Sequence, residues 1–275
     1  MHAHNQPGSN AALGEMHRRQ KRSFLSFGLS CLSDDEFVGA VDEAVQTGSR
    51  LMVSFLNPDY ALRAQDPALN QKINAFDIVL PDGWGIVLGA RLLGLPVLNR
   101  QGNDDICPKV FALSAQRNYK NFLFGSAPGI AERASANLQK AYPRLPVVGA
   151  VHGYWDVLSG HPGWFEDKDN DRLVREINRA QPDILHVGLP TPIQQSWVWK
   201  NVEALDVPVI ITGGSYLDHL AERIQWYPTW INKFRLGWAY RLYREPRRLW
   251  KRYSLDLLSY GRLVLKAKLA DRRSR

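Results

Sequence analysis

The sequence predicts an α/β protein with a Rossmann-like, mainly parallel and doubly wound sheet. Six short apolar, β-branched segments recur along the chain, and segments with helical character lie between them. Strands that are apolar along their whole length are typical of parallel sheets covered on both faces. A chain of 275 residues with 45% hydrophobic content can bury such a core as one domain with appendages.

The elements are expected in the following order. Ser33-Asp34-Asp35-Glu36 is a capping-box pattern, and the helix that it opens should end at Gly48. Strands are expected at about 51–55, 76–80, 120–125, 146–150, 183–188 and 207–212. Helices are expected near 59–73, 84–93, 104–117, 129–141, 169–180 and 192–204. The segment 152–168, rich in Gly, Trp and acidic residues, is expected to be a loop across the edge of the sheet.

Charge divides the chain into three expected regions. Residues 1–22 read as a disordered basic lead without the apolar centre of a secretory signal, and residues 23–222 form the α/β core. Residues 223–275 carry fifteen Lys or Arg against three Asp or Glu, a net charge of +12. Because the whole chain carries +8, the remainder is mildly acidic at −4. The last region is therefore a separate basic appendage.

Composition also indicates the compartment. Cys31 and Cys107 have neither metal-ligand spacing nor the pattern of a disulfide framework, which favours a reduced, cytoplasmic setting. The sequence has no run of about 18 apolar residues, so no segment is predicted to span a bilayer.

The main candidate residues lie between Asn57 and Asp105. Residues 76–80 read as a buried parallel strand, which Pro81-Asp82-Gly83 ends. A carboxylate at the C-terminal end of such a strand sits where open α/β sheets place their ligands. Asp-Gly is also among the commonest turn pairs, so taken alone Asp82-Gly83 is better explained as a turn.

Two later strand-to-helix turns carry further candidates. Thr191-Pro192 suits an N-cap followed by Pro at the first helical position, and Gln194 lies two residues after Pro192. Residues 121–131 predict a strand, a turn at Gly125 and a helix beginning near Pro128, whose N-terminus can hold a phosphate. Each of these two signals is weak by itself.

Together these blocks resemble the WecG/TagA/CpsF family of bacterial glycosyltransferases over about Leu51 to Gly214. The family carries an Asn after an early strand, an Asp-Gly after the next, an Arg before a Gly-x-Asp segment, and a later Gln. Residues 237–242 and 245–253 resemble its Trp-x-Tyr-Arg-Leu and Glu-Pro-Arg-Arg signatures. The chain departs from the family wording at four positions, namely Phe55 for a Thr, Pro190 for a Gly, Ile193 for a Lys and Gln195 for a Glu.

The resemblance implies an inverting transfer of a hexose or N-acetylhexosamine-type sugar from a UDP-sugar donor to a polyprenyl-diphosphate-linked sugar acceptor, in cell-surface or exopolysaccharide biosynthesis. Asp82 would be the general base that takes the proton of the acceptor hydroxyl. The resemblance implies a substrate-binding set of Asn57, Gly83, Arg100, Asp105, Gly125, Gln194, Arg241, Arg247 and Arg248. Asn57 and Gln194 would bind a sugar, and the arginines would neutralise the leaving UDP.

Neither a metal nor another cofactor is expected. Asp167-Lys168-Asp169 is the sequence nearest to an Asp-x-Asp metal motif, and it is expected to lie solvated in a polar loop. Arginine forks suit phosphate and would take the place of a divalent ion.

The appendage interleaves aromatic with basic residues, which suits a helix lying on an anionic membrane. The protein is therefore expected to be peripheral at the inner face of the plasma membrane. In the alternative, the aromatic residues pack on the core while the charges face water.

Two other functions stay open. A nucleotide-binding oxidoreductase would share the fold class, but no G-x-G-x-x-G follows the first strand. A nucleic-acid-binding protein would fit a pI near 9.5, but the basic residues are concentrated in one aromatic-rich tail, so no nucleic acid partner is expected. The sequence leaves a homo-oligomeric state open.

Overall fold

The protein contains a six-stranded sheet in which every pair of neighbouring strands is parallel, with the order β4-β3-β8-β7-β5-β6. The computed structural model describes residues 21–97, 99–153, 167–222, 237–244 and 252–273. The strands of this sheet are β3 (Leu51–Leu56), β4 (Ile78–Pro81), β5 (Asn121–Gly125), β6 (Val147–Val151), β7 (Ile184–Gly188) and β8 (Val209–Thr212).

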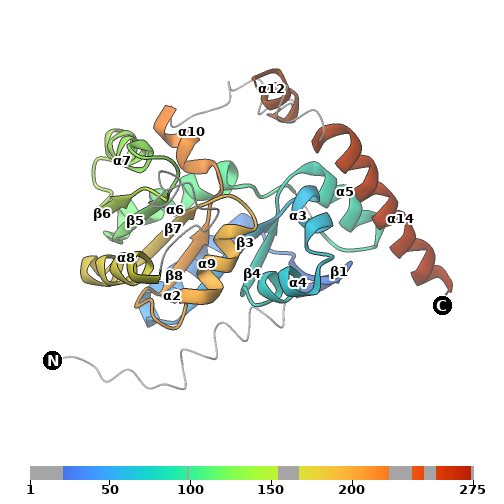
Figure 1. Ribbon diagram of the computed structural model, residues 1–275, viewed down its shortest axis with the longest axis horizontal. Coiled ribbons are helices and arrows are strands. Elements are labelled where there is room, and N and C mark those ends of the chain that lie inside the picture. Colours follow the sequence, from blue (N-terminus) through green and yellow to red (C-terminus); the bar gives the residue numbers. More distant parts are fainter. Residues whose placement is uncertain (1–20, 98, 154–166, 223–236, 245–251, 274–275) are drawn as a thin grey trace.

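Helices cover both faces of the sheet (Figure 1). One face packs against α2 (Asp34–Thr47), α6 (Asn103–Arg117), α7 (Ile130–Ala141) and α10 (Tyr216–Glu222). The other packs against α3 (Pro58–Arg63), α4 (Pro67–Asn74), α5 (Trp84–Leu92), α8 (Asp167–Ala180), α9 (Ile193–Asn201) and α14 (Leu257–Arg273). The predicted doubly wound α/β architecture is confirmed.

Strand β3 is apolar at every position except Ser54. Met52 and Leu56 pack into the core on one face, whereas Leu51, Val53 and Phe55 pack into the core on the other. Because successive side chains of a strand point to opposite faces, a strand covered on both sides needs apolar residues at nearly every position.

The predicted first helix is confirmed together with both of its caps. The Ser33 side chain accepts a hydrogen bond from the backbone of Glu36, and Gly48 ends the helix in the left-handed conformation at φ 67°. The single helix expected over 59–73 is wrong, because the chain forms α3 and α4 there. Asp66 caps α4 by accepting from two backbone N–H groups, and Pro67 occupies the first turn, so a new helix begins at this point.

An antiparallel hairpin, β1 (Lys21–Phe24) and β2 (Phe27–Ser30), precedes the first helix and was not predicted. Its first two residues had been assigned to the disordered lead. The Lys21 ammonium donates to the carbonyl of Phe76, and the Ser30 hydroxyl accepts from the backbone N–H of Val79. The hairpin thus lies beside β4, where it partly covers an edge of the main sheet. Residues 1–20 of the predicted lead and 154–166 of the predicted loop lie outside the described residues.

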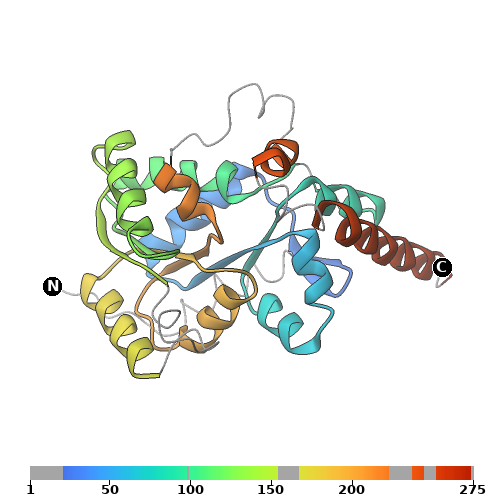
Figure 2. The same cartoon turned by 45° about the horizontal axis from the view of Figure 1, so that its top comes forward.

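The described part of the appendage consists of α12 (Gly237–Arg244), a π-helical turn η2 (Arg252–Asp256) and α14. Tyr260 and Val264 of α14 are buried on the core, beside α5 and α3. Figures 1 and 2 both show α14 alongside α5, with its second half extending away from the sheet. In the described ranges, no helix has the length and apolar character that crossing a membrane requires.

Candidate active site

The predicted site residues of the core lie at the carboxyl edge of the parallel sheet. Asn57 follows β3, Asp82 follows β4, Gly125 ends β5, and Gln194 lies just beyond β7. Open α/β sheets bind their ligands at this edge because the loops and helix N-termini that follow the strands converge there. The fold therefore brings together residues that are far apart in the sequence.

Asp82 stands directly after β4, and its backbone N–H donates to the carbonyl of Leu56 at 2.8 Å. Its side chain keeps 29% of its surface exposed. Gly83 has φ 92°, a conformation that residues with a side chain rarely adopt, and it immediately precedes α5. The structure thus gives Gly83 a backbone role in turning the chain, while its predicted substrate contact stays a prediction.

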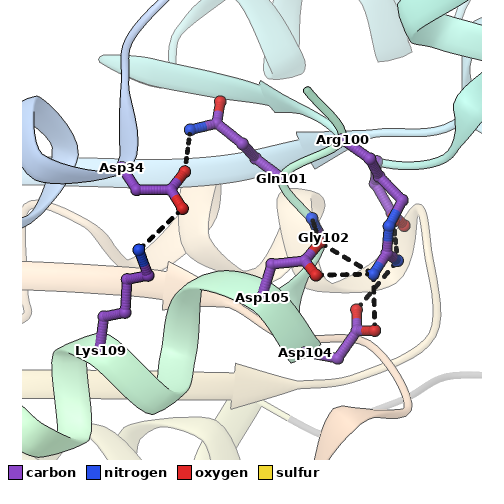
Figure 3. Close-up of polar contacts among 8 residues, drawn as sticks. Asp34, Arg100, Gln101, Gly102, Asp104, Asp105 and Lys109 are labelled. Atoms are coloured by element: carbon purple, nitrogen blue, oxygen red, sulfur yellow. Dashed lines mark hydrogen bonds and ion pairs between the residues drawn. The ribbon is translucent and has the colours of Figure 1, made fainter. Parts of the chain in front are cut away.

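Arg100 contacts three carboxylates. Its Nη1 and Nη2 donate to the two oxygens of Asp104 at 3.0 and 2.7 Å, and Nη2 also donates to Asp105 at 2.9 Å (Figure 3). The nearest oxygen of Asp82 is 3.8 Å from Nη1, beyond hydrogen-bonding distance. We call these four residues the Arg100 cluster. The charge of Arg100 is thus largely offset within the protein, and its predicted role as a phosphate ligand stays a prediction.

The cluster carries more negative than positive groups. Burial and the nearby carboxylates of Asp104 and Asp82 raise the pKa of Asp105 to about 7, although Arg100 and the Gly102 N–H oppose this shift. The same carboxylates raise the pKa of Arg100, so its guanidinium stays charged. Since three carboxylates surround one guanidinium, the cluster retains a proton close to neutral pH.

Asn57 and Gln194 both have structural partners. The Asn57 side-chain oxygen caps α3 by accepting from the Tyr60 N–H at 2.9 Å. Gln194 is 4% exposed; its oxygen accepts from the Gly214 N–H at 2.8 Å, and its nitrogen donates to Thr191 at 3.2 Å. Gln194 therefore ties α9 to the turn after β8. Sugar binding by Asn57 and Gln194 stays a prediction.

The end of β5 depends on two glycines. Gly125 has φ 138°, and a Cβ on it would collide with the backbone carbonyl of Gly188 on β7. Ser126 follows in the left-handed conformation at φ 58°, and its hydroxyl donates to Asp218 of α10 at 3.0 Å. These close contacts explain Gly125 structurally; its predicted part in substrate binding stays a prediction.

Three residues of this edge were not among the predicted site residues, namely Gly102, Ser126 and Asp218. Gly102 stood inside the recognised Gly-x-Asp segment together with Asp104, and this segment was the available signal for it. Asp218 has no such signal, because only the fold brings α10 to the end of β5.

The remaining predicted positions divide into two groups. Arg241 lies in α12, and Arg247 and Arg248 lie outside the described residues.

Phe55 is 5% exposed within the core, so this position offers no hydroxyl to a ligand. Asp167-Lys168-Asp169 begins α8 instead of lying in the predicted loop. Within the described ranges, no three His, Cys, Asp or Glu side chains are grouped to hold a metal ion.

A parallel doubly wound sheet with a partly exposed carboxylate at its carboxyl edge defines an α/β enzyme of Rossmann-like fold. A profile described as "Glycosyl transferase WecG/TagA/CpsF family" matches residues 22–274. The chain therefore belongs to this family, and it is a glycosyltransferase. This assignment replaces the oxidoreductase alternative.

Two relatives illustrate the match. The N-acetylglucosaminyldiphosphoundecaprenol N-acetyl-beta-D-mannosaminyltransferase of Bacillus subtilis (strain 168) is 26% identical over 216 residues, which cover 78% of this chain and 79% of the relative. The protein of the same name from Staphylococcus aureus (strain MW2) is 25% identical over 228 residues, 82% of this chain and 84% of the relative.

Proposed function

We propose that this enzyme transfers a hexose or N-acetylhexosamine-type sugar from a UDP-sugar to a polyprenyl-diphosphate-linked sugar, with inversion, in the synthesis of a cell-surface polysaccharide. The names of both relatives describe transfer of an N-acetyl-β-D-mannosaminyl group to a diphosphoundecaprenol-linked N-acetylglucosamine. The family membership and the coverage of most of each chain support a reaction of the same type here.

The position of Asp82 is the observation that carries the proposal. An inverting transfer needs one base to take the proton of the acceptor hydroxyl as that oxygen attacks the sugar. Asp82 lies at the carboxyl edge, is partly exposed, and makes no hydrogen bond with Arg100, which is occupied by Asp104 and Asp105. A carboxylate held in a tight arginine pair would be a weaker base.

The leaving UDP gains negative charge as the glycosidic bond breaks, and cations must stabilise it. Because Arg100 is neutralised by its own aspartates, we assign this task to Arg241, Arg247 and Arg248 of the appendage. Arg241 lies on α12, which comes before η2 and the docked helix α14 in the chain. In this scheme no divalent ion is needed.

The surface of the appendage supports binding at an anionic membrane. Leu258, Leu265 and Leu269 of α14 are 64%, 53% and 49% exposed, and Leu88 and Leu92 of α5 are 62% and 50% exposed. We call these five residues the leucine face. Arg262 and Lys266, also exposed, lie among the α14 leucines. Exposed leucines beside basic side chains suit the boundary between acyl chains and anionic headgroups.

The packing of α14 bears on how the appendage could meet a membrane. Tyr260 and Val264 are buried in the core, so one side of this helix is already in contact with the enzyme. We propose that one side of α14 completes the core and that the opposite side meets the membrane. Deleting the appendage would therefore expose core surface as well as remove a membrane contact.

A donor screen tests the proposed reaction. Purified enzyme would be incubated with UDP-N-acetylmannosamine, UDP-N-acetylglucosamine and UDP-glucose, each with a short polyprenyl-diphosphate-linked N-acetylglucosamine acceptor. Mass spectrometry should show one glycosylated lipid product, and NMR of a product from an α-linked donor should show the β-anomer. Retention of configuration, or transfer only to water, would contradict the proposal.

A further inference from the structure

We propose that Asp104 and Asp105 are positioning residues that hold Arg100 off Asp82 and so keep the Asp82 carboxylate available to the acceptor hydroxyl. This inference rests on the proposed role of Asp82 as the general base. It assigns to the two helix aspartates a function that neither contact with substrate nor helix capping explains.

The hydrogen-bond distances show which carboxylates Arg100 prefers. Asp104 receives two parallel bonds from the guanidinium, at 3.0 and 2.7 Å, and Asp105 receives a third at 2.9 Å. Bidentate pairs of this kind are among the strongest that Arg forms. Asp82, with its nearest oxygen 3.8 Å from Nη1, is left with an electrostatic contact only.

Both helix aspartates are fixed by the start of α6. They lie in its first turn, where the helix dipole favours negative charge. Asp105 also accepts from the backbone N–H of Gly102 at 3.0 Å, which completes a capping interaction. The Asp105 carboxylate therefore does not have to be ordered anew when it binds Arg100, and this lowers the entropic cost of holding the guanidinium there.

Gly102 allows the three partners to approach one another. A Cβ on this residue would lie 2.7 Å from an Asp104 oxygen, 2.8 Å from an Asp82 oxygen and 2.9 Å from Nη1 of Arg100. The neighbouring Gln101 N–H donates to the carbonyl of Pro81 at 2.8 Å. This bond ties the segment carrying Arg100 to the end of β4, so Arg100 is always within reach of Asp82.

That proximity is why Arg100 must be held. A guanidinium within reach of a single carboxylate would pair with it, stabilise the ionised form and lower its pKa by about 1–3 units. The base would then be weaker, and its lone pairs would point to Arg100 instead of the acceptor. Three carboxylates around one guanidinium avoid this outcome, because the two on α6 occupy the donors first.

The primary test is Asp104→Asn, which removes the bidentate carboxylate but keeps the size of the side chain. Selective ¹³C labelling of aspartate carboxyls, with the Asp82 signal identified by its loss in Asp82→Asn, reports the pKa of Asp82 without any substrate. We expect Asp104→Asn to lower that pKa by about one unit or more as Arg100 turns to Asp82. The acidic limb of the kcat profile should move to lower pH, and the plateau should fall about ten-fold.

Two further variants separate positioning from a general loss of structure or charge. Asp34→Asn is the matched control, because Asp34 pairs with Lys109 and Gln101 next to the cluster and does not contact Arg100 (Figure 3). Asp34→Asn should leave both the pKa of Asp82 and the pH profile of kcat unchanged. Adding Arg100→Gln to Asp104→Asn removes the group that turns, so the pKa of Asp82 should rise again and kcat should partly recover.

An unchanged Asp82 pKa in folded Asp104→Asn protein would overturn the inference, as would a double variant that shows no recovery. Full activity of Asp82→Asn would instead overturn the base role itself. Because the carboxyl titration needs no turnover, these two failures can be told apart.

Discussion

Tyr260 donates its hydroxyl hydrogen to the backbone carbonyl of Gly85 at 3.1 Å, which joins α14 to α5 only three residues beyond Asp82. Gly85 and Gly89 lie one turn apart on α5, and the absence of side chains there makes room for the Tyr260 ring. The helix α14, which carries three of the five leucines of the leucine face, is therefore bonded to the first turn of the helix that follows the proposed base. The proposed membrane-binding surface and the candidate site at the edge of the sheet are therefore parts of one packed unit.

The first prediction concerns Asp82. Asp82→Asn should fold normally and still bind UDP. Its kcat should fall about 100-fold or more, because no base remains to take the proton from the attacking hydroxyl of the sugar acceptor. Turnover and UDP affinity would be measured separately. Asp59→Asn, an aspartate on the neighbouring α3 that pairs with Arg63, is the control and should retain activity. Equal turnover in both variants would remove Asp82 from the mechanism.

The second prediction concerns the leucine face. Replacing Leu258 and Leu265 by Glu should weaken sedimentation with anionic vesicles about ten-fold or more, since each exposed leucine loses its apolar burial and each new charge is repelled. Stability should change little, because both side chains are exposed. Trp199→Glu, an exposed aromatic side chain on α9, is the control. Vesicle binding that survives the double substitution would rule out this face.

The third prediction concerns metal dependence. Activity should persist in EDTA, because the arginines of the appendage are proposed to neutralise the leaving UDP. Arg241→Lys should still lower turnover, since Lys is a point charge and loses the two parallel hydrogen bonds of the guanidinium. Loss of activity in EDTA that Mg²⁺ or Mn²⁺ restores would assign the neutralisation to a metal ion.

The fourth prediction concerns the junction of α5 and α14. A Cβ at Gly89 would collide with the Tyr260 hydroxyl and lie 3.1 Å from a Val264 methyl group. Gly89→Ala should lower the free energy of unfolding by about 1–3 kcal/mol through overpacking, offset by about 1 kcal/mol of helix propensity. Gly39→Ala in α2, where a Cβ meets nothing within 4 Å, should instead stabilise the protein. Urea titrations would compare the two, and equal stabilisation would contradict the proposed packing.

The fifth prediction concerns pH. Burial lowers the pKa of His186 to about 3, and its ring lies 3.0 Å from the Asn121 side-chain oxygen. Between about pH 6.5 and 3 the unfolded chain therefore binds a proton that the folded chain does not, so stability falls as the pH is lowered through that window. From pH 7 to 5 the loss due to His186 should be about 2 kcal/mol.

His186→Gln should be less stable at pH 7, and its free energy of unfolding should depend less on pH between 7 and 5. His219→Gln on α10 controls for removing a histidine. Urea titrations at several pH values give both slopes, and a slope for His186→Gln as steep as that of the unsubstituted protein would show that His186 does not titrate as expected.

The sequence by itself determined the class of the fold. Alternating apolar strands and capped helices lie close together along the chain, and their signals are local. Ser33 and Gly48 delimit α2, and β3 is apolar at all positions but Ser54 because both of its faces are covered. The hairpin β1–β2 escaped prediction because its stability comes from distant partners, such as Phe76 and Val79, which the local sequence does not reveal.

The sequence also placed Asp82, Asn57, Gly125 and Gln194 near strand ends, since a parallel sheet brings such ends to one edge. Only the tertiary structure decided what each side chain contacts. The fold placed Asp104 and Asp105 within 3 Å of Arg100, contacts that its position in the sequence does not reveal. Likewise, only the folded structure distinguishes the side of α14 that is buried, with Tyr260 and Val264, from the side that is exposed, with Leu258 and Leu265. Hydrogen bonds and burial depend on the positions of atoms that are distant in sequence, and those positions exist only once the core has packed.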